Sequence, residues 1–393
     1  MRCIMLVRPG SLISDNHLTL LDSGREYFPE LIRQINEARS EIYFETYIFY
    51  PDEVGRAVMR ALQQAAQRGV QVHVITDWFG TGMRLCRLLR REFEKAGVHF
   101  RVFNPWFYRG LARQHRKVCV IDHQHAFVGG INILDDYRYD YSKKKRFLQA
   151  PRWDFAVLVE GPILNLIQQE VEAFWERVGH MPIRSRFRKY RTSFKRKFAI
   201  AKVALAGFVV RDNFRNRRTI QRAYLRAMGR ARREIILVTP YFAPGRKFRS
   251  ALISAAGRGV KVTLLIGIGE FWWQDAIAKS FFPKLLKSGV RLYEYRKTQL
   301  HGKVAVVDDT WATVGSSNCD GLSLFINHEA NVIVRDTEFA STLREHIFTG
   351  IADAEEIHLE DFKRMPWYRR FWYGTAHLIY RSIMRTVTWG DYN

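Results

Sequence analysis

The sequence predicts an α/β protein built from two similar halves that are related by a pseudo-twofold axis. Segments with helical and strand-like hydrophobic spacing alternate along the 393 residues, a pattern that is typical of mostly parallel sheets. Three short stretches of the first half recur in the second half in the same order: 38–42 in 231–235, 68–72 in 258–262, and 95–98 in 287–290. Two copies exclude a solenoid and favour a pair of domains.

The elements of the first half follow from their apolar spacing. In chain order we expect a helix at 30–39, a strand at 41–49, a helix from 52 to 68, a strand at 70–77, a helix at 83–96 and a strand at 97–103. Gly69 supports the end of the second helix, because glycine suits the position that follows a helix. The second half repeats this order.

A basic stretch, 184–197, separates the halves. It contains no acidic residue, and we expect it to be a linker between an N-terminal domain at 1–183 and a C-terminal domain at 198–361. The apolar stretch 198–210 includes Lys202 and partly alternates. An opening strand of the second domain is therefore favoured over a membrane hairpin.

The chain ends in a segment, 362–393, that combines aromatic and basic side chains. Pro366 suits the start of a helix, on which Trp367, Phe371 and Ile383 fall near one face. One interpretation is a closing helix that is docked on the core. The other, which we favour, is a membrane-associating amphipathic helix whose basic side chains reach lipid headgroups.

Composition points to a polyanionic partner. The chain has 63 Lys and Arg against 39 Asp and Glu, so its formal net charge is +24, and 47% of its residues are hydrophobic. The apolar fraction is ample for sizeable cores, while the charge fits either nucleic acid or an anionic membrane surface.

Metal and disulfide sites are not indicated. The four cysteines are scattered without close pairs: Cys3, Cys86, Cys119 and Cys319. His123 and His125 invite a metal interpretation, but no acidic or cysteine companions stand at ligand spacing, so a solvated loop is favoured. We expect no metal and no cofactor.

One pattern of chemically active residues occurs twice. The copies are His115, Lys117 and Asp122, and His301, Lys303 and Asp308. After the same gap, each copy continues into a small-residue turn and an asparagine: Gly130 with Asn132, and Ser316 with Asn318. A single copy is a weak signal, but two copies that share all spacings are a strong one.

The spacing places each histidine beside its lysine. Residues two apart on an extended strand point to the same face at roughly 7 Å separation. If the halves pack about a pseudo-twofold axis, both histidine–lysine pairs meet at one site. Such a site suits phosphodiester chemistry without a metal, because lysine and asparagine side chains stabilise charge on the phosphate oxygens while one imidazole attacks phosphorus and the other protonates the leaving oxygen.

Four carboxylates deserve separate interpretations. Asp154 and Glu329 each precede an apolar run, and we expect them to orient the histidines through the second ring nitrogen, with surface ion pairs as the alternative. Asp122 and Asp308 belong to the repeated motif, but each closes a strand just before a turn. We expect these two acids to hold the turns rather than to carry protons.

The doubled pattern H-x-K-x4-D-x6-G-[GS]-x-N is the signature of the phospholipase D superfamily, which this chain resembles over about 15–360. It looks closest to the bacterial cardiolipin synthases of the phospholipase D type, through residues 115–117, 300–318 and 329–332. The resemblance implies two phospholipase D-like α/β domains with the active site at their interface. By family analogy, His115 is the nucleophile that forms a phosphohistidine, and His301 is the acid and base. Four further residues are expected to bind substrate: Gly130, Asn132, Ser316 and Asn318.

The implied reaction is phosphatidyl transfer. A phosphatidyl group passes from one phospholipid to the histidine and then to the primary hydroxyl of phosphatidylglycerol, which gives cardiolipin and releases the first headgroup. One alternative is a phospholipase that hydrolyses its substrate, and another is a nuclease, for which the charge is equally suitable.

The expected partners are phospholipid substrates and an anionic membrane, with no nucleic acid, because aromatic and arginine residues in 362–393 fit an interface better than a base-stacking groove. The family's common form carries N-terminal transmembrane helices, which we do not find here. We therefore expect a peripheral protein on the cytoplasmic face of the cell membrane, held by the basic linker, the tail, and the aromatic loops 105–109 and 271–273.

Overall fold

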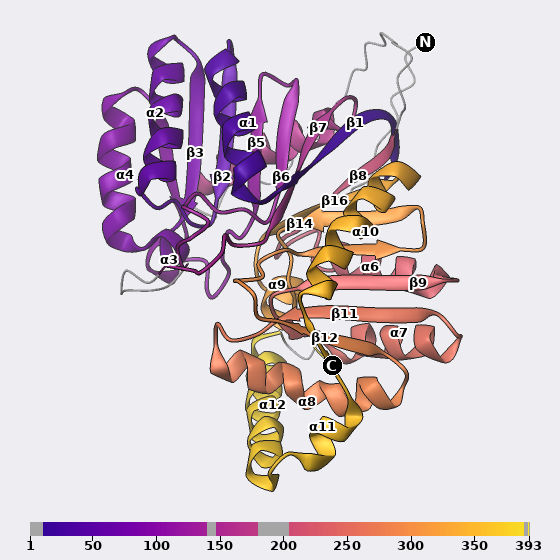
Figure 1. Cartoon of the computed structure of the whole chain (residues 1–393). Coiled ribbons are helices and arrows are strands. Elements are labelled where there is room, and N and C mark those ends of the chain that lie inside the picture. The colour runs from indigo at the N-terminus through magenta and orange to yellow at the C-terminus, as the bar shows by residue number, and fades with distance from the viewer. Residues whose placement is uncertain (1–10, 140–146, 180–203, 389–391, 393) are drawn as a thin grey trace.

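The computed structural model, which describes residues 11–139, 147–179, 204–388 and 392, confirms the α/β fold (Figure 1). The first half contains β1 (Ile13–Asp22), α1 (Ser23–Glu37), β2 (Glu41–Thr46), α2 (Glu53–Gln67), β3 (Gln71–Asp77), α3 (Trp78–Thr81), α4 (Met83–Lys95), β4 (His99–Phe103), the 3-10 turn η1 (Pro105–Phe107), β5 (Lys117–Ile121), β6 (His125–Gly129), β7 (Phe155–Glu160) and α5 (Leu164–Gly179).

The second half follows nearly the same order. It contains β8 (Ala204–Arg211), α6 (Thr219–Arg230), β9 (Glu234–Thr239), β10 (Phe242–Ala243), α7 (Arg246–Gly257), β11 (Lys261–Gly267), α8 (Trp272–Lys287), β12 (Arg291–Tyr295), β13 (Val304–Val307), β14 (Trp311–Gly315), β15 (Cys319–Asp320), α9 (Gly321–Phe325), β16 (Glu329–Arg335), α10 (Thr337–Ala352), β17 (Glu355–Ile357), α11 (Leu359–Arg364) and α12 (Trp367–Val387). The predicted linker, 184–197, lies outside the described residues. The stretch 198–210 is described from Ala204 onward, where β8 is the expected opening strand.

The duplication is visible in the strand order of the main sheet. Its fifteen strands run β17-β12-β11-β9-β13-β14-β16-β8-β1-β7-β6-β5-β2-β3-β4. From the central antiparallel pair of β8 and β1, the order on one side is the counterpart of the order on the other, with β17 added at one edge. The two halves therefore share one continuous sheet about a pseudo-twofold axis.

The sheet is less parallel than the sequence predicts. Parallel pairing is limited to β2 with β3, β3 with β4, β9 with β11, and β11 with β12. The motif strands β5 and β13 pair antiparallel with their neighbours. The reason is the connection: β5 and β6 are joined by a short turn, which permits only an antiparallel hairpin.

One hydrophobic core crosses the boundary between the halves. Val118 and Phe155 from the first half pack in the same buried cluster as Ala206, Val304 and Val332 from the second. Since burial of apolar surface is the main favourable term in folding, this shared core fixes the two motif strands relative to each other.

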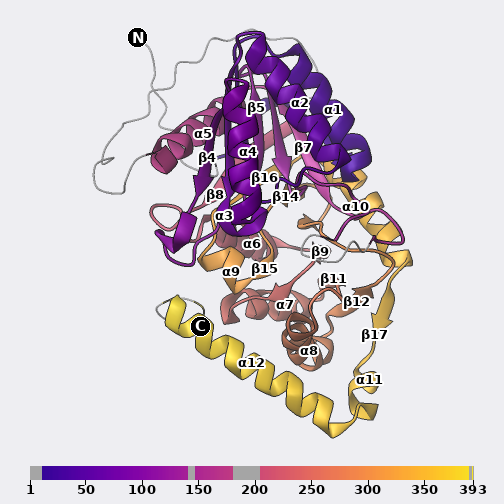
Figure 2. The same ribbon diagram turned by 90° about the vertical axis from the view of Figure 1, so that its left-hand side faces the viewer.

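Helix α12 is docked on the second half by one of its faces. Ala376, Tyr380 and Met384 are buried, and the hydroxyl of Tyr380 hydrogen bonds with the backbone N–H of Gly321 at 2.9 Å. Figure 2 shows α12 running along the lower edge of the molecule. Within the described residues, no helix combines the length and the apolar character that a membrane crossing requires.

Candidate active site

Each motif histidine is held beside the opposite half of the chain. His115 lies just before β5, and its backbone N–H donates to the carbonyl of His328 at 2.9 Å. His301 lies just before β13, and its N–H donates to the carbonyl of Trp153 at 2.8 Å. The residues that follow these two carbonyls are Glu329 and Asp154. The backbone thus carries each predicted carboxylate to the histidine of the other half.

The imidazole of His115 is oriented from the second half. Its Nδ1 lies 3.0 Å from Oε2 of Glu329 and 3.1 Å from the carbonyl oxygen of Ser316. Both partners accept hydrogen bonds, so the proton of a neutral imidazole resides on Nδ1 and the lone pair on Nε2. The hydroxyl of Ser316 donates to the same carboxylate oxygen at 2.5 Å, which fixes the carboxylate in turn.

The imidazole of His301 is oriented from the first half in the same way. Its Nδ1 lies 2.5 Å from Oδ2 of Asp154. The other carboxylate oxygen of Asp154 accepts the backbone N–H of Phe155 at 2.8 Å, and Nζ of Lys303 lies 3.9 Å from Oδ2. Both histidine–carboxylate pairs are buried, so little water competes for these hydrogen bonds.

Burial shifts the titration of the site. It lowers the pKa of His115 below its ordinary value, although Glu329 acts in the opposite direction. Burial also raises the pKa of Asp154, and Lys303 opposes that change. Lys303 contributes to the shift at His115 and Lys117 to that at Asp154, which places both motif copies in one electrostatic environment.

The two motif lysines are buried and are placed alike. Nζ of Lys117 donates to the carbonyl of His115 at 2.8 Å, and Nζ of Lys303 donates to the carbonyl of His301. The sequence places each lysine beside its histidine, and these bonds agree with that spacing. Two ammonium groups held at one site can stabilise negative charge on a bound phosphate.

The four residues predicted to bind substrate fall into two groups. Asn132 and Asn318 are buried, and among the described residues neither Nδ2 of Asn132 nor Oδ1 of Asn318 has a hydrogen-bond partner. Ser316 is fully buried and contacts Glu329, while a Cβ atom added at Gly130 would lie only 2.2 Å from Oδ1 of Asp154. These two small residues lie against the carboxylates instead of facing an open site.

Asp122 and Asp308 lie away from the imidazoles, at the far ends of β5 and β13. The carboxylate of Asp122 accepts the backbone N–H groups of Arg39, Ser40 and Glu41. Asp308 does the same for residues 232, 233 and 234. Each of these carboxylates thus ties its strand end to the turn before β2 or β9.

Two features of the site are absent from the sequence prediction. The ring of Tyr47 stands edge-on to His115 at 4.8 Å, with Nζ of Lys117 at 5.3 Å from the Tyr47 ring centre. Arg116 is fully buried, and its Nε lies 2.8 Å from Oε2 of Glu45. Burial raises the pKa of Glu45 to about 7. The sequence holds one signal for this pair. The two motif copies differ at this position, with Arg116 in the first copy and glycine in the second, which marks the arginine as specific to the first half.

The turn beyond Asp122 brings together a group that the sequence does not reveal. His123 contacts Glu41, and possible ligand atoms of these two residues and of Glu172 lie within 4.8 Å of one another. The acidic residues near His123 thus come from positions that are distant in the sequence. About half of the His123 side chain is exposed. The group lies at the other end of β5 from His115. The cysteines that the structure describes, Cys86, Cys119 and Cys319, are buried and free.

Comparisons with known proteins agree with this geometry. The family model described as cardiolipin synthase, PLD-like domain, matches residues 31–138 and 224–349. Cardiolipin synthase B of Salmonella typhi is 39% identical over 362 residues, and that of Escherichia coli (strain K12) is 38% identical over 364; each alignment covers 90% of this chain and 85% of the relative. A crystal structure of phosphatidylserine synthase from Haemophilus influenzae Rd KW20 has a similar fold, with a TM-score of 0.65, 14% identity and 94% of each chain covered. This chain belongs to the cardiolipin synthase family of phospholipase D-like proteins.

Proposed function

We propose that this chain is a cardiolipin synthase, a phosphatidyltransferase that joins two phospholipids through a covalent phosphatidyl-histidine. The observation that carries the proposal is the pair of crossed histidine–carboxylate contacts, His115 with Glu329 and His301 with Asp154. They hold two imidazoles, each by a carboxylate of the other half, in a chain that is similar to cardiolipin synthases over most of its length.

The first step uses His115 as the nucleophile. With Nδ1 held by Glu329, Nε2 attacks the phosphorus of the donor phospholipid, and the bond from phosphorus to the headgroup oxygen breaks. His301, protonated and held by Asp154, gives its proton to that oxygen, so the headgroup leaves as a neutral alcohol. The two lysines and the asparagine amides stabilise the charge that develops on the non-bridging oxygens.

The second step reverses the roles of acid and base. The primary hydroxyl of phosphatidylglycerol approaches the phosphohistidine, and the now neutral His301 removes its proton. The hydroxyl oxygen bonds to phosphorus, the bond to Nε2 of His115 breaks, and cardiolipin is released. Water in place of the lipid alcohol gives phosphatidic acid, which makes hydrolysis the side reaction of the same site.

Helix α12 supports a peripheral position on a membrane. Opposite its docked face, Trp367, Phe371 and Leu378 are each more than half exposed. Trp372 stacks on the exposed Trp272 of α8 at 5.3 Å, which extends the patch. A patch of this kind on a chain of net charge +24 fits the anionic cytoplasmic leaflet. We place the protein at that face.

The test of the function is product analysis. The purified chain is incubated with phosphatidylglycerol vesicles and, separately, with single-stranded DNA, both in the presence of a chelator. We expect cardiolipin and glycerol from the lipid, and neither from His115→Ala. Phosphatidic acid alone would reassign the chain as a hydrolase, and cleaved DNA without lipid turnover would reassign it as a nuclease.

A further inference from the structure

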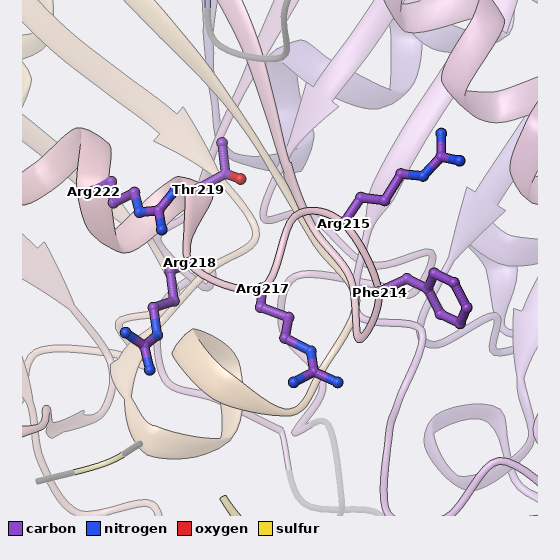
Figure 3. A pocket seen from close by; sticks show the side chains of 6 residues that line it. All are labelled: Phe214, Arg215, Arg217, Arg218, Thr219 and Arg222. Atoms are coloured by element: carbon purple, nitrogen blue, oxygen red, sulfur yellow. The ribbon is translucent and has the colours of Figure 1, made fainter. Parts of the chain in front are cut away.

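The two halves of the sheet differ in two places. Between β8 and α6 the second half has the extra loop 212–218, whereas in the first half α1 follows β1 directly. The arginine side chains of this loop and of α6 extend in different directions, so they do not converge on one ligand (Figure 3). The other difference lies in the first half, on both sides of His115 in the sequence.

Both sequence neighbours of His115 reach one buried carboxylate. Nε of Arg116 lies 2.8 Å from Oε2 of Glu45, and Nη2 of Arg116 donates to Oε1 at 3.0 Å. From the other side of the histidine, Nε2 of Gln114 donates to Oε2 of Glu45 at 3.4 Å. All three residues are buried, and we call them the clamp. Because successive residues of an extended chain point to opposite faces, the clamp leaves the imidazole of His115 directed to the site.

The clamp is anchored to helix α5. Nη1 of Arg116 donates to Oε1 of Glu170 at 3.1 Å, and the same oxygen accepts a hydrogen bond from Arg177 at 2.8 Å. The guanidinium carbon of Arg116 lies 4.6 Å from the centre of the Phe174 ring, within the range of a cation–π contact. The guanidinium is planar and its donors stand in a fixed fork, so these contacts fix its orientation.

The second half closes the same part of the fold with apolar residues. The strand register and the motif spacing replace every member of the clamp: Glu45 by Val238, Gln114 by Leu300 and Arg116 by Gly302. A buried ion pair often stabilises a fold no more than apolar side chains of similar volume do. Stability therefore does not explain why the clamp is present beside the nucleophile and absent, among the described residues, beside His301.

The backbone holds the two histidines unequally. His301 and the residue after it both donate their N–H groups to the carbonyl of Trp153, at 2.8 Å and 3.0 Å. In the first half the carbonyl of His328 accepts the N–H of His115 at 2.9 Å but not that of the next residue, all of which the structure describes. The nucleophile thus has one backbone hydrogen bond fewer at this point, and the side chains of the clamp supply the missing constraint.

We propose that Arg116 and Glu45 are positioning residues for the nucleophile, which together with Gln114 fix the main chain on both sides of His115. This inference rests on the proposed function, because there Nε2 of His115 forms and later breaks the bond to phosphorus. That bond must form in line with the leaving oxygen, and a misplacement of about 1 Å can cost roughly 100-fold in rate. His301 moves only a proton, so its half works without a clamp.

The test replaces the whole clamp by apolar side chains. Q114L/R116M/E45L removes its polar members together and keeps their volume, so no member of the clamp stays buried without its partner and the fold is retained. The matched control is K279M/E294L/R296M, which does the same at another buried carboxylate. There Glu294 lies 2.8 Å from Lys279 and 2.5 Å from Arg296, between α8 and β12. A third variant, R116K, keeps the positive charge beside Glu45 but loses the planar fork.

Turnover of phosphatidylglycerol vesicles is the first measurement. We expect the clamp variant to lower kcat about 100-fold, the loss that a displaced nucleophile causes, with KM within about twofold of wild type. The control should keep kcat within about twofold, because its charges do not contact either catalytic histidine. R116K should lower kcat about tenfold, since one hydrogen bond to a charged group is worth roughly that factor.

Proton NMR is the second measurement and needs no turnover. The Nδ1–H of His115, which is hydrogen bonded to Glu329, is assigned by the loss of its resonance in His115→Ala. We expect this resonance to shift or broaden in the clamp variant and in R116K, and to stay as in wild type in the control. A clamp that only stabilised the fold would lower the unfolding midpoint and leave the resonance unchanged.

Three kinetic results would overturn the proposal: normal kcat in the clamp variant, equal losses in that variant and the control, or normal kcat in R116K. If the clamp variant does not fold, R116K decides by both measurements. If wild-type protein forms no cardiolipin, the proposed function fails, and the resonance of His115 still decides about the clamp. An unchanged resonance in R116K would then overturn the positioning role, and a changed one would support it.

Discussion

At the scale of single residues, the two catalytic imidazoles differ mainly in what lies behind their carboxylates. Glu329 is braced by the hydroxyl of Ser316, whereas Asp154 fits closely against Gly130, where a side chain would collide. Glu329 with the Ser316 hydroxyl in one half, and the shorter Asp154 against Gly130 in the other, occupy equivalent positions. The two halves have thus diverged by compensating changes, which suits two imidazoles with different tasks.

Glu329→Gln tests the orientation of the nucleophile. The carboxylate accepts the Nδ1 proton of His115, and an amide that turns its NH2 group toward Nδ1 would favour the wrong tautomer. By analogy with triads we expect kcat to fall on the order of 10³ to 10⁴-fold, with KM for lipid little changed. Steady-state kinetics on phosphatidylglycerol vesicles measure both.

The matched control for that variant is Glu234→Gln, which makes the same chemical change at a buried acid remote from the site. It should retain at least about half of the activity, because its partner is the half-exposed Arg344. A Glu329→Gln enzyme with near-normal kcat would show that His115 is oriented by its backbone and by Ser316 alone.

The lowered pKa of His115 has a consequence for the pH profile. A nucleophilic imidazole must be neutral, and burial disfavours its protonated form. As pH falls, His115 therefore stays neutral below the ordinary imidazole value of about 6.5. We expect the acidic limb of kcat/KM to lie below that value. A limb above about 6.5 would indicate that the ion pair with Glu329 outweighs burial.

The sequence predicts the members of this site far better than their pairing. The doubled spacing identifies both histidines and both lysines, and the apolar runs that follow Asp154 and Glu329 indicate both carboxylates. It does not show that Glu329 belongs to His115, because that contact depends on the parallel bridge of Gln114 with His328, which joins residues far apart in the chain. The sequence does not predict Tyr47 at the site for the same reason, since only the folded sheet brings it beside the motif.

At the scale of elements, α12 combines the two interpretations that its sequence allows. Tyr380 and Met384 are core residues of the second half, while a separate face carries exposed apolar side chains. The spacing of apolar residues covers most of the helix circumference and does not say which side is docked. Because Phe362 and Tyr392 are also buried in this core, removal of 362–393 would open the domain.

Point substitutions on the exposed face test membrane binding without that damage. Phe371→Ser with Leu378→Ser removes two side chains that are 70% and 61% exposed. Each apolar side chain that enters the interface contributes roughly 1 to 2 kcal/mol, so we expect sedimentation with anionic vesicles to weaken at least about 30-fold. The thermal unfolding midpoint should stay unchanged, because both side chains are mostly exposed.

Leu88→Ser with Leu205→Ser is the control for this pair, since both residues are partly exposed on other elements. These substitutions should leave vesicle binding as it is. If the α12 pair and the control pair behave alike, the exposed face of α12 is not the membrane-binding surface, and the aromatic loop around Trp106 becomes the stronger candidate.

At the scale of the whole molecule, the shared sheet makes the site a property of one chain. Repeated sequence stretches predict the pseudo-twofold relation, but not that the halves join through β1 and β8 into a single sheet. That pairing involves edge strands whose sequences do not show which partner they will meet. It also explains why neither motif copy is complete, because each carboxylate comes from across the axis.

A mixing experiment distinguishes a site within one chain from a site shared between chains. His115→Ala and His301→Ala should each be inactive, and because both imidazoles and both carboxylates come from one continuous sheet, a mixture of the two proteins should stay inactive. Wild-type protein diluted with His115→Ala serves as the control, and its activity should fall in proportion to its fraction. In a further arm, the two variants are unfolded and refolded together. Recovery of cardiolipin formation would then show that the halves of different chains can pair, so that a first half and a second half form the catalytic unit even when they come from different chains.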